Sequence, residues 1–159
     1  ADRGLVLEAP TLVMSRPLEI TEPVEGVTES PVATSAWVET ELAALDIDRS
    51  SVGPWLATIA VVPSPALFVV STENGAPVGA GFGVVVDALL GVFEIVVRPE
   101  FRQRGHARRI MAALHRFGVG EGAERVFLQV LADDERSIAL YRSLGYDVSH
   151  QYWYRRAEG

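Results

Sequence analysis

The sequence predicts a mixed α/β fold in which helices cover both faces of one sheet. Three neighbouring segments, 66–71, 78–86 and 90–97, are dense in Val, Leu and Phe and are separated by short turn signals, a pattern typical of a strand meander. The rest of the chain then alternates helical and strand patterns. Crossovers of this kind after a meander indicate a mixed sheet with helices on its faces.

The segments before the meander predict one strand and two helices. Residues 11–18 alternate well enough for a first strand, and residues 19–31, rich in Glu, Pro, Thr and Ser, are expected to be an exposed connection. Pro31 favours the first turn of a helix. Apolar residues then recur at helical spacing: Trp37, Val38, Leu42 and Leu45. A second short helix is expected over 54–62, ended by the prolines that follow.

The turns of the meander and the helix after it have clear local signals. Asn74-Gly75 predicts a hairpin, because both residues tolerate the positive φ of a tight turn. Asp87 marks the next turn. A helix is expected over 103–117, where one apolar stripe recurs, and Gly118 and Gly120 are expected to end it.

The last elements complete the order β–α–α–β–β–β–α–β–α–β. Residues 125–131 are apolar on both faces, which favours a central strand. A helix over 134–144, closed by Gly145, leads to a last strand over 146–156. We find no internal boundary and expect a single domain over 1–159, with the alternative that the chain is the C-terminal part of a longer protein.

Composition excludes several kinds of chemistry. The chain has no cysteine and only three scattered histidines, so disulfides and thiolate sites are excluded and no metal is expected. All fourteen basic residues are Arg, which excludes a P-loop lysine and a Schiff base. No segment resembles a signal peptide, and the apolar runs are shorter than the ~20 residues that cross a bilayer. We therefore expect a cytoplasmic protein without a membrane partner.

The charge is negative overall and unevenly distributed. A net charge of −7 argues against nucleic acid as a partner. Residues 1–97 contain three Arg and thirteen acids, whereas residues 98–159 contain eleven Arg and eight acids. This asymmetry suits a cationic substrate that meets an anionic cofactor, and an uneven but solvated surface explains it equally well.

Two glycine-rich strings are poor phosphate loops. Gly79-Ala80-Gly81-Phe82-Gly83 lies inside a strand pattern, and Gly118-Val119-Gly120-Glu121-Gly122 runs from helix to strand. A phosphate loop needs the opposite order, with the glycines at a helix N-terminus. We interpret the first string as strand residues that allow close approach and the second as a helix end and loop.

Residues 94–109, EIVVRPEFRQRGHARR, have the right order. An apolar strand stops at Pro99, and an amphipathic helix begins through Arg102-Gln103-Arg104-Gly105-His106-Ala107. The first amides of a helix lack internal partners and carry the positive end of its dipole, so they bind anions. Gly105 and Ala107 would let a pyrophosphate approach, and Arg104 and Arg108 would add positive charge.

This segment resembles motif A of the Gcn5-related N-acetyltransferase (GNAT) superfamily, [RQ]-x-x-G-x-[GA] between a strand and a helix. Residues 128–146, LQVLADDERSIALYRSLGY, are similar to the family's motif B. The resemblance covers residues 66–155, and the first 65 residues match only in element order. It implies a GNAT-type, mostly antiparallel central sheet of six to seven strands, with acetyl-CoA as co-substrate and an amine as acceptor.

The resemblance assigns a role to each matching residue. Backbone groups of Ile95, Val96 and Val97 would bind the acetyl-pantetheine arm beside a bulge and polarise the thioester carbonyl. The cofactor-binding loop would comprise Arg102, Gln103, Arg104, Gly105, His106, Ala107 and Arg108. Tyr141 would contact the cofactor and protonate the leaving CoA thiolate, whose parent thiol has a pKa of about 8.5 by analogy with cysteine.

Three residues carry open alternatives. Asp134 stands where the family usually has Asn, and it is either a helix N-cap or a contact to the pantetheine arm. Glu94 is the candidate general base, with an outward-facing carboxylate as the alternative. Gln129 replaces a Glu that is frequent in enzymes acting on protein N-termini, which argues against a ribosomal-protein acceptor.

The remaining aromatic and histidine residues receive weaker assignments. Trp37, Trp55 and Trp153 either line an acceptor site or pack in the core. His106 is expected to contribute only its backbone amide, and His115 is expected on the exposed part of its helix.

Three hypotheses follow from these observations: an active N-acetyltransferase, a regulatory module that binds acyl-CoA without turnover, and a structural half of a tandem acetyltransferase. The third rests on a faint repeat, Gly4-Leu5 with Arg16 against Gly145-Tyr146 with Arg156. The family resemblance also makes a homodimer a candidate assembly.

Overall fold

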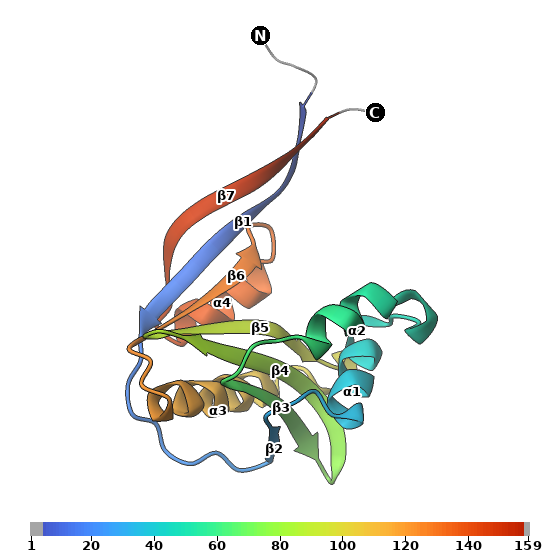
Figure 1. The fold of residues 1–159 in the computed structure, drawn as a ribbon, viewed down its shortest axis with the longest axis vertical. Helices are drawn as coiled ribbons and strands as arrows, with labels where there is room; N and C mark the ends of the chain where they lie inside the picture. The colour runs from blue at the N-terminus through green and yellow to red at the C-terminus, as the bar shows by residue number, and fades with distance from the viewer. Residues whose placement is uncertain (1–4, 158–159) are drawn as a thin grey trace. The chain divides into compact units, whose positions relative to one another are not determined.

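The computed structural model describes residues 5–157, with the side chains of residues 10–153. These residues form two compact units, one over Leu18–Val126 and the other over the described parts of Ala1–Pro17 and Phe127–Gly159. Seven strands and four α-helices, with every resolved register antiparallel, occur within this part of the chain (Figure 1). The expected mixed α/β class is confirmed. No helix among these residues is long and apolar enough to cross a bilayer.

The unit over Leu18–Val126 contains the meander as neighbouring antiparallel strands. Its strands are β2 (Val27–Ser30), β3 (Ala66–Glu73), β4 (Ala76–Val86) and β5 (Leu89–Val97), in the order β2-β3-β4-β5. Its helices are α1 (Ser35–Leu45), α2 (Gly53–Ala60) and α3 (His106–Gly120), with short 3-10 turns at Arg49–Ser51 and Pro99–Phe101. Asn74 and Gly75 have φ of 51° and 78°, which confirms the hairpin turn.

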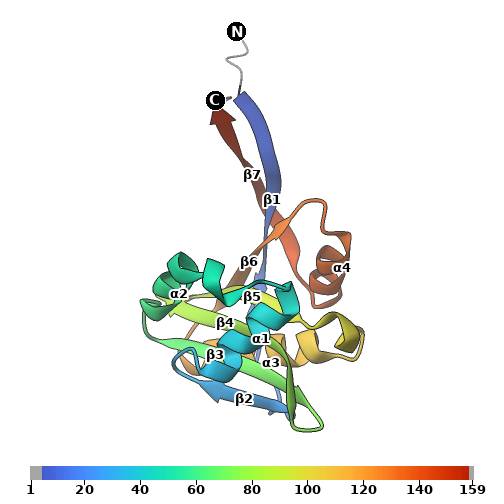
Figure 2. The same ribbon diagram turned by 90° about the vertical axis from the view of Figure 1, so that its right-hand side faces the viewer.

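Helices α1 and α3 cover opposite faces of β3, β4 and β5 (Figure 2). The residues of β4 alternate between these faces, as strand geometry requires. On one face Trp37 of α1 packs edge-on against Phe68 and Phe82, with ring centroids 5.1 and 5.9 Å away. On the other, a Cβ at Gly79 would lie 3.1 Å from Ile110 of α3, and one at Gly83 3.2 Å from Leu114. The first glycine string therefore allows close helix packing.

The second unit is built on a long antiparallel pair. It contains β1 (Leu5–Pro17), α4 (Glu135–Ser143), β7 (Asp147–Ala157) and most of β6 (Arg125–Leu131). Strand β1 lies between β6 and β7 in the strand order. Gly145, with φ of 86°, follows α4 as expected, and Arg16 of β1 donates to the Leu144 carbonyl. Gly4 lies outside the described residues, so the proposed repeat is not tested.

Residues 19–31 are not only a connection, which corrects that prediction. Val27–Ser30 form β2, which pairs antiparallel with β3 from Val27 opposite Ser71 to Ser30 opposite Phe68. The sequence VTES has little apolar pattern of its own. It becomes a strand because β3 offers an edge of unpaired backbone groups.

Three helix boundaries also differ from the prediction. Helix α1 begins at Ser35 instead of Pro31, because the Thr34 side chain caps it by accepting from the Trp37 amide. Helix α3 begins at His106 instead of residue 103, because Gln103 and Gly105 have positive φ. It continues through Gly118, where a Cβ would lie 2.9 Å from the Leu90 side chain.

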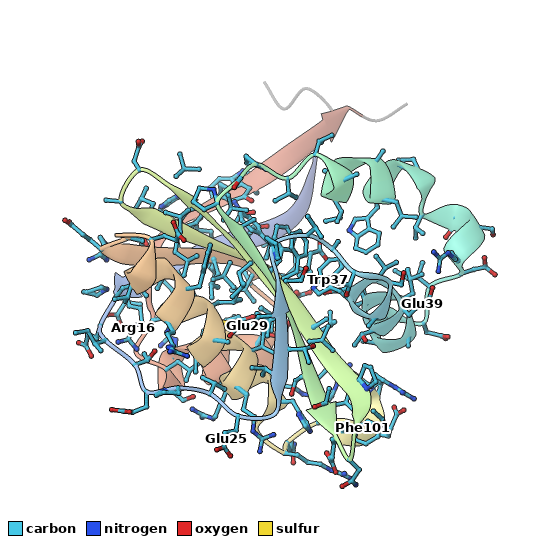
Figure 3. The ribbon with its side chains drawn as sticks, turned by 60° about the horizontal axis from the view of Figure 1, so that its bottom comes forward. Arg16, Glu25, Glu29, Trp37, Glu39 and Phe101 are labelled. Carbon is cyan, nitrogen blue, oxygen red and sulfur yellow. The ribbon has the colours of Figure 1, made fainter. Side chains whose placement is uncertain are left out.

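Replacing Trp37 by Phe should destabilise the protein by about 2–4 kcal/mol. Trp37, labelled in Figure 3, is fully buried. Its Nε1 donates to the Gly81 carbonyl at 2.9 Å. The change removes this donor, leaves a buried acceptor and opens a cavity. Urea unfolding should show a much smaller loss for Trp55→Phe, since Trp55 is only partly buried. Equal losses for the two variants would contradict the role given to the Trp37 hydrogen bond.

Candidate active site

A β-bulge interrupts the pairing of β4 and β5 where the sequence places its candidate base. Ala80 pairs with Val96 and Phe82 with Phe93, so Gly81 faces two residues, Glu94 and Ile95. Glu94 has φ of 56° and an exposed side chain. An extra residue of this kind twists the strand and leaves backbone groups outside the ladder. The expected bulge is therefore present, and Ile95, Val96 and Val97 form the half-buried end of β5.

The loop after β5 turns sharply into α3. Gln103 has φ of 61° and Gly105, the N-cap of α3, has φ of 84°. No described side chain caps this helix start, and an added Cβ on Gly105 would have no atom within 4 Å. Turns of this kind point successive backbone N–H groups toward one place and suit an anion.

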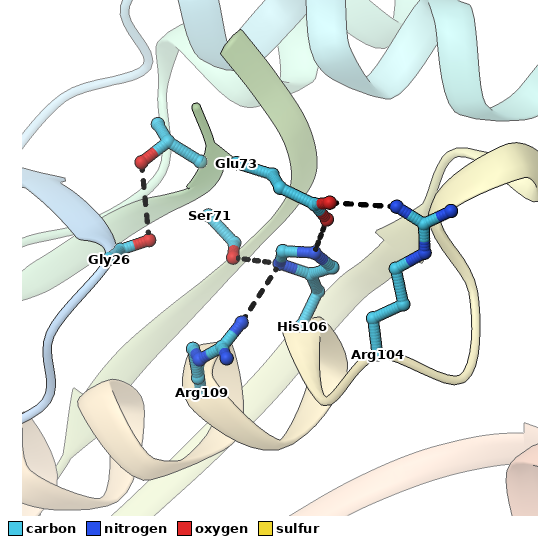
Figure 4. Close-up of polar contacts among 7 residues, drawn as sticks. Gly26, Ser71, Glu73, Arg104, His106 and Arg109 are labelled. Carbon is cyan, nitrogen blue, oxygen red and sulfur yellow. Dashed lines mark hydrogen bonds and ion pairs between the residues drawn. The ribbon is translucent and has the colours of Figure 1, made fainter. Parts of the chain in front are cut away.

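His106 is fully buried and joins the loop to strand β3 through its side chain (Figure 4). Its Nδ1 lies 2.7 Å from the Ser71 hydroxyl and 3.3 Å from an Arg109 guanidinium nitrogen, and its Nε2 lies 2.8 Å from Glu73. A neutral ring with its proton on Nε2 satisfies all three contacts, because Nδ1 then accepts and Nε2 donates to Glu73. The expectation that His106 contributes only its amide is therefore wrong.

Glu73 is the acid that orders this side of the loop. Its carboxylate accepts a hydrogen bond from His106 and forms an ion pair with Arg104, with 2.7 Å between nitrogen and oxygen. The His106 hydrogen bond is the main cause of the lowered pKa of this carboxyl. The Arg104 guanidinium also lies 5.3 Å from the Phe101 ring centroid. Arg104, which we expected beside a pyrophosphate, is thus engaged with protein groups.

An open polar pocket of about 540 Å³ lies beside this network. Glu25, Asn74 and Arg109 line it together with Glu73, Arg104 and His106. Its wall mixes acidic and basic groups. It therefore has no uniform positive surface that would select a free anion.

The other residues expected to bind the cofactor are mostly exposed on the loop and the first turn of α3. Arg102 is exposed, and its Nε donates to the Val97 carbonyl at 3.2 Å. Gln103 and Arg108 are exposed, and Ala107 is half-buried in the first turn of α3.

Tyr141 and Asp134 belong to the second unit. Tyr141 is buried, and burial, followed by the nearby Asp134 carboxylate, raises its pKa to about 12. Its ring centroid lies 5.9 Å from that of Tyr146. Asp134 is the N-cap of α4 and accepts from the Ser137 amide at 3.1 Å, which confirms the cap interpretation. Gln129 is exposed on β6, whose alternating burial shows that only one face is buried.

Two of the tryptophans pack together and the third is exposed. Trp37 and Trp55 stack with centroids 5.8 Å apart, whereas Trp153 is about half exposed. Trp37 is a core residue, as the packing alternative stated. His115 is buried, which corrects its expected exposure: α3 is covered on a wider face than its apolar residues alone indicate.

Sequence reasoning missed one buried acid. Glu41 on α1 is fully buried, and no described residue hydrogen-bonds either carboxyl oxygen. Burial, followed by the charge of Glu94, raises its pKa to about 9. The signal was present in the sequence, because Glu41 stands four residues after Trp37 and four before Leu45 on the apolar stripe.

Comparisons with known proteins agree with this geometry. The sequence model of the acetyltransferase (GNAT) family matches residues 32–146. An uncharacterized N-acetyltransferase of Bacillus subtilis, YobR, is 32% identical over 71 residues, which cover 45% of this chain and 29% of the relative. An acetyltransferase of Pectobacterium atrosepticum is 30% identical over 84 residues, which cover 53% of this chain and 60% of the relative.

Solved structures show the same fold. A GCN5-related N-acetyltransferase from Sphaerobacter thermophilus superposes with a TM-score of 0.72 at 24% identity, covering 96% of this chain and 53% of the other. The ribosomal-protein-S18-alanine N-acetyltransferase from Escherichia coli gives a TM-score of 0.62 at 25% identity, covering 76% and 77%. The chain spans less than two thirds of the two curated relatives named above. Since the family match extends over most of the sequence and the fold agrees with it, the chain belongs to the GNAT acetyltransferase family.

Proposed function

We propose that this protein transfers the acetyl group of acetyl-CoA to the nitrogen of a primary amine of a small molecule or peptide. The observation that carries the proposal is the uncapped start of α3, preceded by a left-handed Gly105 and by the bulged end of β5. Residues 102–108 would hold the pyrophosphate, mainly through backbone amides. Backbone groups of Ile95, Val96 and Val97 would bind the pantetheine arm.

The reaction is an acyl transfer in which the charges balance. The amine arrives as an ammonium ion and gives one proton to Glu94, directly or through water. Its nitrogen lone pair then attacks the acetyl carbonyl carbon, and a β5 amide stabilises the oxygen as it gains negative charge. The C–S bond breaks, and the CoA sulfur leaves with the bonding electrons. Tyr141, whose raised pKa keeps its hydroxyl protonated, would donate a proton to that sulfur. The attacking nitrogen then loses its second proton, which returns to the Tyr141 oxygen through water, so that a neutral amide and a free thiol are released.

Two further parts of the proposal come from sequence and resemblance. A cytoplasmic location is tested by cell fractionation of the native protein. A homodimer is tested by sedimentation of the purified protein at several concentrations. Neither bears on the acetyl-transfer step itself.

Gly105→Ala should weaken the binding of acetyl-CoA at least tenfold, because the new Cβ would occupy the open space that the ligand needs. Gly122→Ala is the matched control, since Gly122 also has positive φ, 83° against 84°, and open space around it. Both variants should lose about 1–2 kcal/mol of stability. Calorimetric binding of acetyl-CoA distinguishes them.

The whole proposal is tested by the release of free thiol from acetyl-CoA in the presence of a panel of amines. Wild-type protein should release thiol with at least one amine. If acetyl-CoA binds and no amine of a broad panel accelerates thiol release, the protein is an acyl-CoA-binding module and not a transferase. If Gly105→Ala and Gly122→Ala bind acetyl-CoA equally well, the proposed pyrophosphate site is misplaced.

Tyr141→Phe should lower kcat about 10²–10⁴-fold, in the range of a general acid, while the dissociation constant of acetyl-CoA stays within about threefold. The change removes only the hydroxyl and keeps the packed ring. Stopped-time thiol assays at saturating amine measure kcat. Tyr152→Phe, a half-exposed tyrosine of β7, serves as control. An unchanged kcat in Tyr141→Phe would rule out the acid role.

Glu73→Ala should destabilise the protein at neutral pH, and the difference from wild type should vanish in acid. A carboxyl whose pKa is lowered by folding contributes its stability above its unfolded pKa of ~4.3 and loses it as the pH falls through the lower folded value. Urea unfolding from pH 7 downward measures both proteins. Glu25→Ala, an exposed residue on the same pocket wall, is the control and should change the stability little at neutral pH. A gap that stayed constant would mean that Glu73 acts by packing alone.

A further inference from the structure

Glu41 is an unusual residue for the interior of this unit. Its side chain is fully buried, yet neither carboxyl oxygen has a hydrogen-bond partner among the described residues. A buried carboxyl without a partner is strongly disfavoured in either protonation state. Native proteins keep such groups where a ligand or a bound water completes them.

The position of Glu41 places it at the bulge of β5. Glu41 lies one helical turn after Trp37, on the same face of α1. Trp37 donates to the carbonyl of Gly81, and Gly81 stands opposite the bulged residues Glu94 and Ile95. The charge of Glu94 adds to the rise in the pKa of the Glu41 carboxyl, as this placement leads one to expect. Glu94 itself is exposed to solvent.

No described element packed around Glu41 supplies a cation to this pair. Strand β4 and helix α2 contain no titratable side chain. Strand β3 contributes only Glu73, which is bound to Arg104 and His106, and Glu94 is the only titratable residue of β5. The other acid of α1, Glu39, pairs with Arg49. Two neighbouring acids therefore lack the positive partner that would stabilise them.

We infer that Glu41 and Glu94 form the recognition site for the ammonium group of the acceptor, and that the acceptor is a primary alkylamine with no carboxylate next to its nitrogen. This inference rests on the proposed function and names the substrate class of the same site. A primary ammonium brings three N–H donors and one positive charge, which complete the Glu41 oxygens and offset both acids. An α-carboxylate would add a third negative group and be repelled.

Binding of such an amine should be coupled to ionisation of Glu41. Burial and Glu94 hold the pKa of Glu41 at about 9 in the free protein, so its carboxyl is protonated at neutral pH. A bound ammonium acts in the opposite direction and lowers that pKa. The amine should therefore displace a proton from Glu41 when it binds near pH 7.5.

The test uses matched pairs of amines on the intact protein with CoA in place of acetyl-CoA, so that no transfer occurs. Tyramine and tyrosine differ by one carboxylate, as do agmatine and arginine. Isothermal titration should show at least tenfold tighter binding of the amine than of the amino acid for at least one pair. Titration in buffers of different ionisation enthalpy should show proton release with the amine.

Glu41→Gln removes the ionisable group and keeps its size. We expect at least tenfold weaker amine binding, loss of the preference over the amino acid and no proton release, with the affinity for acetyl-CoA unchanged. Glu39→Gln, on the same helix but exposed and paired with Arg49, is the control and should match wild type. Urea unfolding checks that each variant is folded. If Glu41→Gln fails to fold, Glu41→Leu takes its place in the test. Leucine cannot hydrogen-bond, so we expect the same three losses.

Three outcomes would overturn the inference: equal binding of amines and amino acids to wild type, an unchanged preference in Glu41→Gln or Glu41→Leu, or no proton release in wild type. These measurements need no turnover. If amines bind with the expected preference but no thiol is released from acetyl-CoA, the proposed function fails while the ammonium site stands. If thiol is released but amino acids bind more tightly than amines, the ammonium site fails while the proposed function stands.

Discussion

The hydrogen bond from Trp37 to the Gly81 carbonyl, made where β5 carries one extra residue, fixes the arrangement on which the candidate site depends. The extra residue leaves Gly81 opposite two partners, and the indole N–H binds the carbonyl of that residue. Helix α1 is thereby held at the bulge. The glycines of β4 let α3 approach the opposite face, so that both helices are positioned by a few residues of one strand. The end of β5 then continues into the loop that starts α3.

The sequence predicts well the features that depend on local chemistry. The Asn74-Gly75 hairpin, the Asp134 cap and the left-handed Gly145 follow from conformations that few other residues adopt. The close approach allowed by Gly79 and its neighbours could also be predicted. Because no helix follows these glycines, a phosphate loop was rejected and close packing remained as the explanation. Motif spacing found the loop before α3, since an anion site at a helix start needs only a strand, a turn and a helix in order.

Features that depend on contacts distant in sequence were not predictable in the same way. Strand β2 exists because β3 offers its edge, and nothing in VTES requires it. The chain from Ser71 through His106 to Glu73 joins residues more than thirty positions apart, and its members have no shared local pattern. Glu41 is a different case, because its place on the apolar stripe of α1 could be seen in the sequence. A search for apolar residues at helical spacing passes over an acid on the stripe, although a buried acid is costly and therefore informative.

The electrostatics of the site follow from which charges are already engaged. Arg104 is bound to Glu73, so the loop presents backbone amides, which suit an anion without the loss of an existing ion pair. At the bulge of β5, Glu94 and the α1 residue Glu41 lack a positive partner among the described residues. Only Val96 and Val97 follow the bulged residues on β5. An anionic co-substrate would thus meet backbone amides at the start of α3, and a cationic acceptor would meet two acids at the bulge of β5. Neutral amides at both places would not create this difference.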